Sequence, residues 1–431
     1  MAAQLEKAEE AGARPAQSAG GMFRALSHRN FRLFWAGAFL SNVGTWMQAV
    51  AQGWLVLQLT NSPFWLGVDG FMATAPGLLL TLAGGVFADL VDRRRILLYT
   101  QIGAGLSAFA LATLLITHVV RDASHVWIIL LLTFWTGCCM ALAGPSYQAI
   151  TIDLVGREDL ANAIALNSTQ FQLSRVVGPV FAGLALHALG LAGCFYANGI
   201  SYIAVVAALM MVRFDRVAQP QGHAHALGDK RAFLHDLMEG LRYVRRRPRV
   251  FMLLTISAMT SLFGAPYLSL VPLFARDILH LNESGLALMM GLAGAGAFCG
   301  ALFVTFLGDF RYKGWSVLGG ACAFGLCLIG FSFSTRLNVS LAYLFGMGFA
   351  IVCSVAVINT LLQKLVTDEM RGRVMSMFIL SFIGAMPIGN LLAGTFAQRF
   401  GAPRTLATGG LIIAVFAAII TIRNKRLRNL Y

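Results

Sequence analysis

The chain has 431 residues, of which 58% are hydrophobic and only 12% are charged, whereas soluble domains carry roughly 25% charged residues. This composition is typical of an integral membrane protein and excludes an ordinary soluble enzyme or binding domain. The net charge of +14 does not indicate a nucleic-acid partner, because the basic residues are divided among seven separate segments instead of forming one footprint.

Apolar stretches of about 20 residues recur along the chain, and a helix of that length crosses a bilayer core of roughly 30 Å. They predict twelve membrane-spanning helices, numbered here as spans 1 to 12: 31–58, 64–89, 96–118, 124–152, 160–188, 191–213, 249–276, 284–307, 313–334, 337–364, 373–398 and 403–422.

A polar stretch at 214–248 separates the first six spans from the last six. We therefore expect an all-α integral membrane protein with twelve transmembrane helices in two pseudo-symmetric six-helix bundles. Within the polar stretch, RAFLHDLMEGLRYVRRRP predicts an amphipathic helix that lies on the cytoplasmic membrane surface. A soluble linker helix is the alternative. The expected regions are a cytoplasmic tail at 1–30, bundles at 31–213 and 249–423, a central loop at 214–248, and a basic cytoplasmic tail at 424–431.

The distribution of basic residues predicts the orientation. With the N-terminus in the cytoplasm, 27 of the 33 Lys and Arg residues fall on cytoplasmic segments, five on outer loops and one, Arg175, inside a span. This asymmetry satisfies the positive-inside rule. Both termini are therefore expected in the cytoplasm.

The two halves also resemble each other in sequence. A shift of 211 residues places Glu158 on Glu369 and Gly178 on Gly389. Transporters are often built from repeated bundles that rock about a central site.

The connection between spans 2 and 3, GGVFADLVDRRR at 84–95, concentrates charge between two apolar helices. Because it is short, the two helices must be antiparallel neighbours, and its charges lie at the cytoplasmic surface. Its pattern resembles the loop signature of the major facilitator superfamily. The matching positions are Gly85, Asp89, Asp92, Arg93 and Arg94, although Asp92 stands where that signature usually has glycine. A weaker echo, GDFRYKG, occurs at 308–314 in the second half.

Further stretches resemble the branch of this superfamily that includes enterobactin exporters and macrolide efflux pumps: HRNFRLFWAGAFLSNVGTWMQ at 28–48, GREDLANAIALNSTQFQLSRVVGP at 156–179, EGLRYVRRRP at 239–248 and DEMRGRVMSM at 368–377. The resemblance implies a secondary active transporter of the bacterial inner membrane, working by alternating access as a proton-coupled exporter of an amphipathic siderophore or drug. It implies a monomer, with no cofactor and no metal.

Two alternatives remain open at this point. The same branch contains lysophospholipid transporters, so a lysophospholipid flippase is one of them. A membrane-embedded enzyme is the more remote one, since no nucleophile, metal set or acid pair accompanies the polar residues of the spans.

The superfamily resemblance also implies partners for the charges at the cytoplasmic side. Asp89 would face the start of span 11 near Arg371 and Arg373, and Arg93 would face Asp153 at the end of span 4. An anion is stabilised at a helix N-terminus by up to about 1 kcal/mol. These contacts would hold a cytoplasmic gate shut. The alternative is that the charges only fix the topology.

Span 5 contains SRVVGPVFAG at 174–183, which resembles the antiporter motif of drug exporters, although Ser174 and Ala182 replace glycines of that motif. Small residues allow close helix approach, and proline removes a backbone donor, so Gly178, Pro179 and Gly183 predict a bend beside a cavity. Plain helix packing is the alternative.

Two ionisable residues stand out within the spans. Arg175 lies about fifteen residues into span 5, near mid-bilayer, and a buried guanidinium is costly unless it meets water or a partner. We expect it to attract an anionic substrate group or to pair with a carboxylate; a static arginine bonded to carbonyls is the alternative. Asp69 in span 2 is a second candidate for proton coupling, unless it is simply hydrated at the outer mouth. Span 4 lacks the superfamily's usual arginine, which directs attention to Arg175.

Neutral polar residues outline an expected cavity. Four of them recur on one helical face of span 1 at spacings of three or four, a pattern that lines water or meets polar groups of another helix. The candidates are Asn42, Thr45, Gln48 and Gln52 in span 1, with Tyr147, Gln148, Gln170, Tyr267 and Asn359 in later spans. Trp46 and Phe171 nearby suit a large amphipathic ligand.

Overall fold

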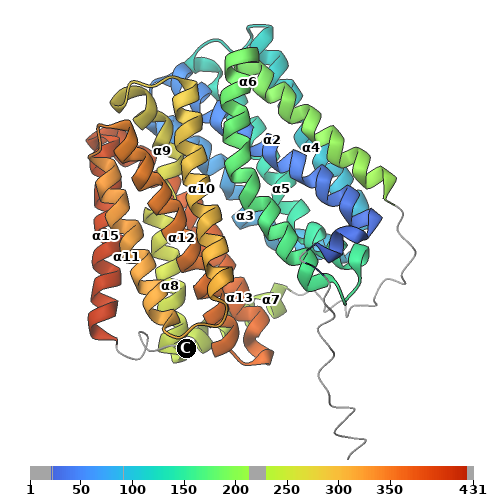
Figure 1. The fold of residues 1–431 in the computed structure, drawn as a ribbon, viewed down its shortest axis with the longest axis vertical. Helices are drawn as coiled ribbons and strands as arrows, with labels where there is room; N and C mark the ends of the chain where they lie inside the picture. The colour runs from blue at the N-terminus through green and yellow to red at the C-terminus, as the bar shows by residue number, and fades with distance from the viewer. Residues whose placement is uncertain (1–20, 22, 91, 213–229, 425–431) are drawn as a thin grey trace, which may run out of the picture.

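The computed structural model describes residues 21, 23–90, 92–212 and 230–424; for 81–90 and 230–237 it describes the helix backbone only. Every regular element in these ranges is helical (Figure 1). Residues 1–20 of the expected N-terminal tail, 425–431 of the expected C-terminal tail and 214–229 of the central loop lie outside the described residues.

The N-terminal half contains a short 3₁₀ turn followed by long helices. Gly190, with φ of +69°, breaks the last helix into two spans, because this backbone conformation ends a right-handed helix. The elements are η1 (Arg24–Ser27), α2 (Arg29–Thr60), α3 (Pro63–Leu90), α4 (Arg93–Ile116), η2 (Ala123–His125), α5 (Val126–Val155) and α6 (Leu160–Met211).

The C-terminal half begins with the linker helix α7 (Lys230–Arg246). Two of its spans are interrupted, so that one consists of α8, α9 and the π-helical turn η3, and another of α13 and α14. The elements are α8 (Pro248–Phe263), α9 (Tyr267–Leu273), η3 (Phe274–Ile278), α10 (Glu283–Leu307), α11 (Lys313–Ser332), α12 (Leu337–Leu365), α13 (Asp368–Ile383), α14 (Ala385–Phe400) and α15 (Ala402–Arg423).

These elements confirm the predicted architecture of twelve spans in two six-helix bundles. Within the described residues, nine helical segments are long and apolar enough to cross a membrane. The second span of α6, together with α2 and α3, completes the twelve. Their outward faces are apolar, as the 91% exposure of Phe306 illustrates, which suits contact with lipid.

The bundle has two ends that differ in charge. The end that carries most of the basic residues is called the basic end, and it holds η1, α7 and the connections at 91–92, 156–159, 308–312 and 366–367. The opposite end is called the far end, and it holds the connections at 61–62, 117–125, 279–282, 333–336 and 401.

The halves contact each other through two equivalent helix pairs, α6 with α10 and α3 with α14. At the far end, Ser62 donates to Gln398 over 2.7 Å, and Arg276 donates to the Leu57 carbonyl over 3.1 Å. The contacts continue to about the middle of each helix, where Gln172 donates to the Ala297 carbonyl over 3.3 Å. Below that level α6 and α10 diverge toward the basic end (Figure 1).

Candidate functional site

Arg175 lies in α6 at the level where the halves meet. Its guanidinium stacks 5.1 Å from the centre of the Trp46 ring on α2, and its Nε is buried without a hydrogen-bond partner. The phenol of Tyr267, which begins α9 in the other half, is also buried and unpartnered, and α9 packs against α2, the helix that carries Trp46. The two candidates therefore lie on opposite halves, each on a helix that packs against α2.

Asp69 is the centre of a hydrogen-bond network within the N-terminal half. Its Oδ1 accepts from Gln52 Nε2 over 2.7 Å and from Thr133 Oγ1 over 3.1 Å. Gln52 Nε2 also donates to Thr133 Oγ1 over 2.7 Å. Asp69 thus joins α2, α3 and α5, and within the described residues it forms no ion pair.

The polar face of α2 extends this network. Gln48 Nε2 donates to Gln52 Oε1 over 3.4 Å, while Gln48 Oε1 accepts from Asn198 Nδ2 in the second span of α6 over 2.6 Å. Thr45 lies one turn further along, with its hydroxyl 3.3 Å from the hydroxyl of Tyr202. Thr45, Gln48 and Gln52 therefore contact polar groups on neighbouring helices. Asn42, half-buried on the same face, is placed beside them.

The remaining polar candidates lie outside this network. The Tyr147 hydroxyl is 3.5 Å from Gln170 Oε1, so these two link α5 to α6, while Gln148 is exposed. Asn359 accepts from Gln363 on the same helix over 2.6 Å and is not joined to the other candidates by any hydrogen bond that the described residues form.

The three small or bending residues of α6 pack against two different helices. A Cβ added at Gly178 would lie 2.8 Å from the Val43 carbonyl oxygen on α2. Pro179 and Gly183 face α10, where Pro179 Cβ would be 3.8 Å from a Cβ at Gly291. Close helix packing therefore accounts for the positions of these residues in this conformation.

The charged connection after α3 is organised by Asp92 and Arg93. Asp92 caps α4 by accepting from the backbone N–H groups of Arg94 and Arg95 over 2.8 and 3.4 Å. Arg93 Nη1 donates to Asp153 Oδ2 at the end of α5 over 3.0 Å, so the structure brings this expected pair together. Arg94 donates to the Met210 carbonyl over 3.0 Å.

The second half holds a related ion pair with the signs reversed. A shift of 211 places Asp153 on Lys364, and a shift of 216 places Arg93 on Asp309. Asp309 accepts from Lys313 and from Lys364, the latter over 2.6 Å. Hydrogen bonds from Lys313 and Lys364, and their positive charges, lower the pKa of Asp309 to about 2. Each half thus joins two neighbouring helices through charge at the basic end.

The two arginines expected near Asp89 both form ion pairs at the start of α13. Arg371 pairs with Asp368 in the first turn of α13, and Arg373 Nη1 lies 2.6 Å from Glu239 Oε2 on α7. The linker helix is therefore attached to the start of span 11. Gly85 and Asp89 lie in the part of α3 whose side chains are not described.

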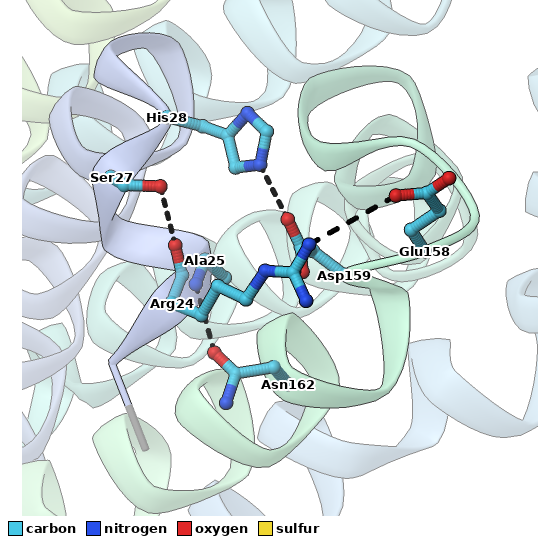
Figure 2. A network of polar contacts seen from close by, with 7 residues as sticks. All are labelled: Arg24, Ala25, Ser27, His28, Glu158, Asp159 and Asn162. Atoms are coloured by element: carbon cyan, nitrogen blue, oxygen red, sulfur yellow. Dashed lines mark hydrogen bonds and ion pairs between the residues drawn. The ribbon is translucent and has the colours of Figure 1, made fainter. Parts of the chain in front are cut away.

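The sequence interpretation missed a clasp between the N-terminal segment and the start of α6 (Figure 2). Asp159 is 7% exposed, and its two oxygens accept from Arg24 Nε over 2.9 Å and from His28 Nε2 over 2.8 Å. The Ala25 N–H donates to Asn162 over 2.9 Å. Residues 24–28, part of the expected tail, are thus ordered. The sequence signal for these contacts was Asp159, the acidic residue of GREDL that directly precedes a predicted span.

Replacing Asp159 with Asn should release η1. The neutral amide loses both charge-assisted bonds, and hydrogen bonds to charged groups contribute about 1.5–3 kcal/mol. Limited trypsin digestion should therefore cut after Arg24 and Arg29 roughly tenfold faster, since about 1.4 kcal/mol changes an open population tenfold. The control is Glu158→Gln, because Glu158 is exposed and reaches Arg24 only at 4.0 Å. Equal digestion of both variants would show that the clasp does not hold the segment.

The fold and site define a multi-pass membrane transporter, in which two six-helix bundles enclose polar and charged groups at the level where they meet. The chain belongs to the transmembrane secretion effector family, a branch of the major facilitator superfamily, because the model of that family matches residues 20–430. It is a transporter and not an enzyme.

Three characterised relatives align along almost the entire chain. The staphyloferrin A transporter of Staphylococcus aureus is 22% identical, covering 92% of this chain and 97% of its own. Macrolide efflux protein A of Streptococcus pyogenes is 23% identical, covering 92% and 96%. The enterobactin exporter of Shigella flexneri is 25% identical, covering 94% of each.

A solved structure supports the fold. The crystal structure of a bacterial homologue of the human lysosomal transporter Spinster, in an inward-facing and unoccupied conformation, superposes with a TM-score of 0.69 at 15% identity. It covers 91% of this chain and 96% of its own.

Proposed function

We propose that this protein is a secondary active exporter that works by alternating access and moves an amphipathic small molecule, such as a siderophore or a drug, out of the cell in exchange for protons. One observation carries the proposal. The halves meet through two equivalent helix pairs from the far end to mid-bundle, and Arg175, whose Nε is buried without a partner, lies on α6 near the level where those contacts end.

The distribution of charge indicates which end of the bundle faces the cytoplasm. With the basic end in the cytoplasm, as the positive-inside rule requires, the far end faces outward. The contacts of Ser62 with Gln398 and of Arg276 with Leu57 then close the outer side. Rocking the halves about the site would open that side and close the basic end.

The three characterised relatives favour a siderophore or drug over a lysophospholipid, since the names of all three refer to siderophores or macrolides. Asp69 is the proposed proton carrier, because it is a carboxyl group within a span that is held by neutral donors. The polar residues of α2 and the groups around Arg175 form the proposed substrate site.

Export is tested by finding and then transporting the substrate. Metabolites secreted by cells with and without the protein are compared, and the one that differs is offered to inverted membrane vesicles. We expect accumulation that requires a proton gradient and that a protonophore abolishes. Accumulation to the same level without a gradient, or conversion of the compound by detergent-purified protein, would contradict the proposal.

We propose that Arg93 and Asp153 fix α4 against α5 and so support the cytoplasmic gate, the surface at the basic end that closes when the halves rock. Asp153→Arg places two guanidinium groups together, and we expect transport to fall about tenfold, as like charges at close range cost on the order of 1 kcal/mol or more. Combining it with Arg93→Asp should restore most of the activity. If the double variant transports no better than Asp153→Arg, attraction between the two charges is not what transport requires at these positions.

A further inference from the structure

Arg175 is a cation in the membrane interior, and no anionic side chain pairs with it in the part of the chain that the structure describes. Within the described residues its side chain makes no ion pair and no hydrogen bond, and Nε is buried. Its guanidinium lies over the face of Trp46, 5.1 Å from the ring centre. Stacking on an aromatic ring stabilises a desolvated cation, but it does not replace the hydrogen bonds that a buried guanidinium requires.

Tyr267 supplies a second unsatisfied donor from the opposite half. Its side chain is 1% exposed, and its hydroxyl has no partner. The chain interruption at Gly264 to Pro266 positions this phenol at the start of α9, which packs against α2, the helix that carries Trp46. Two buried donors without an acceptor favour a ligand that accepts hydrogen bonds.

Asp69 does not neutralise Arg175. Its Oδ1 accepts hydrogen bonds from Gln52 and Thr133, and within the described residues its carboxylate forms no ion pair with the guanidinium. A static role in which backbone carbonyls bond the guanidinium is also inconsistent with this conformation, because no such bond is formed within the described residues.

An apolar surface adjoins the guanidinium. The rings of Trp46 and Phe171 pack edge to face with their centres 6.3 Å apart, and Phe171 is 47% exposed. A ligand held by Arg175 would therefore rest an aromatic or aliphatic body against these rings.

We infer that Arg175 and Tyr267 form an anion-binding subsite and that the exported compound is an organic anion, with a carboxylate or another acidic oxygen group beside an aromatic or apolar body. This inference rests on the proposed function and adds the charge of the substrate. The planar guanidinium suits a carboxylate because it offers two parallel N–H donors. A ligand that bonds Arg175 and Tyr267 also connects the halves, so its binding favours their approach.

The first test requires no knowledge of the substrate and uses iodide as a bare anion. Fluorescence of the wild-type protein minus that of Trp46→Phe reports Trp46 alone. We expect iodide to quench this signal roughly fivefold more effectively than caesium, because the uncompensated guanidinium attracts anions and repels cations. Acrylamide, which is neutral, measures access. Equal quenching by iodide and caesium, once corrected for access, would overturn the inference.

Variants then assign the effect to Arg175. Arg175→Gln should remove the preference for iodide and leave acrylamide quenching unchanged, whereas Arg175→Lys should retain the preference. If Arg175→Gln does not elute as a folded monodisperse protein, the ion comparison in the wild type and in Arg175→Lys still decides the matter.

The second test measures transport with matched probes in inverted vesicles: naphthalene-1-acetate, its neutral amide and 1-naphthylethylamine. We expect the anion to be accumulated about tenfold better than the other two, and Tyr267→Phe to reduce this preference. Preferential transport of the amine or amide would sink the anion inference while leaving export intact. Iodide attraction without gradient-driven transport of any probe or of the secreted metabolite would support the subsite and contradict the exporter proposal.

Discussion

Replacing Gly294 with alanine is expected to shift the protein away from the conformation in which the far end is closed. The Cα of Gly294 on α10 faces the backbone of α6, where a Cβ would collide with the Arg175 carbonyl group and lie 3.1 Å from the Val176 nitrogen. Backbone atoms cannot move aside as a flexible side chain can, so the two halves must separate. Overpacking of this kind costs typically 1–3 kcal/mol, which corresponds to roughly a tenfold to hundredfold change in population.

Gly291, one turn earlier on α10, provides a matched control. A Cβ at this position would lie 3.8 Å from Pro179 Cβ and 3.9 Å from the Val176 carbonyl oxygen, which is ordinary van der Waals contact. Gly291→Ala introduces the same methyl group and the same gain in helix propensity. We therefore expect it to leave the conformational equilibrium nearly unchanged.

Cross-linking measures the difference. Cysteines at positions 62 and 398 would be close in the far-end-closed state, because the Ser62 hydroxyl donates to Gln398 over 2.7 Å. In a background in which the seven native cysteines are replaced, the cross-linking rate should fall at least about tenfold for Gly294→Ala and stay near its starting value for Gly291→Ala. If both variants react equally fast, contact between α6 and α10 does not control closure.

The sequence predicts the number and limits of the spans because lipid imposes a simple requirement on length and polarity. Gly190 falls in the gap expected between spans 5 and 6, although α6 continues beyond it. Hydropathy cannot show that two later spans are interrupted. The break between α8 and α9 falls at Gly264 to Pro266. Pro266 packs closely against Gly389 of α14, where an added Cβ would lie 3.1 Å from Pro266 Cγ, and this packing exists only in the assembled bundle.

The sequence identified individual residues of the site, but the hydrogen bonds that join them could be recognised only in the structure. Gln52 and Asp69 were separate candidates, and the hydrogen bonds that join them also include Thr133, which no pattern in span 4 distinguished. Asn198 was overlooked for the same reason, since its partner Gln48 is 150 residues away. The pair of Arg373 with Glu239 on α7 was not predicted either, because this contact depends on how the linker packs.

Asp69→Asn is expected to abolish accumulation against a gradient while leaving exchange intact. Asparagine keeps the carbonyl oxygen that accepts from Gln52 and Thr133, so the network that joins α2, α3 and α5 should persist. What it loses is the ability to bind and release a proton. A gradient of one pH unit sustains about a tenfold accumulation for each proton exchanged, and the variant should show none of it. The measurement compares uptake of the identified substrate into inverted vesicles under an imposed pH gradient with substrate exchange at equal pH.

Asp122→Asn is the control for this experiment. Asp122 lies in the far-end connection before α5, bonded to Ser124 and His125, with 64% of its side chain exposed. Its replacement removes the same charge outside the spans and should leave both assays unchanged. If Asp69→Asn accumulates substrate as well as the wild type, the proton binds elsewhere or is not the coupling ion. If it loses accumulation and exchange together, Asp69 contributes to substrate binding or folding, since the loss of a coupling proton alone predicts that exchange survives.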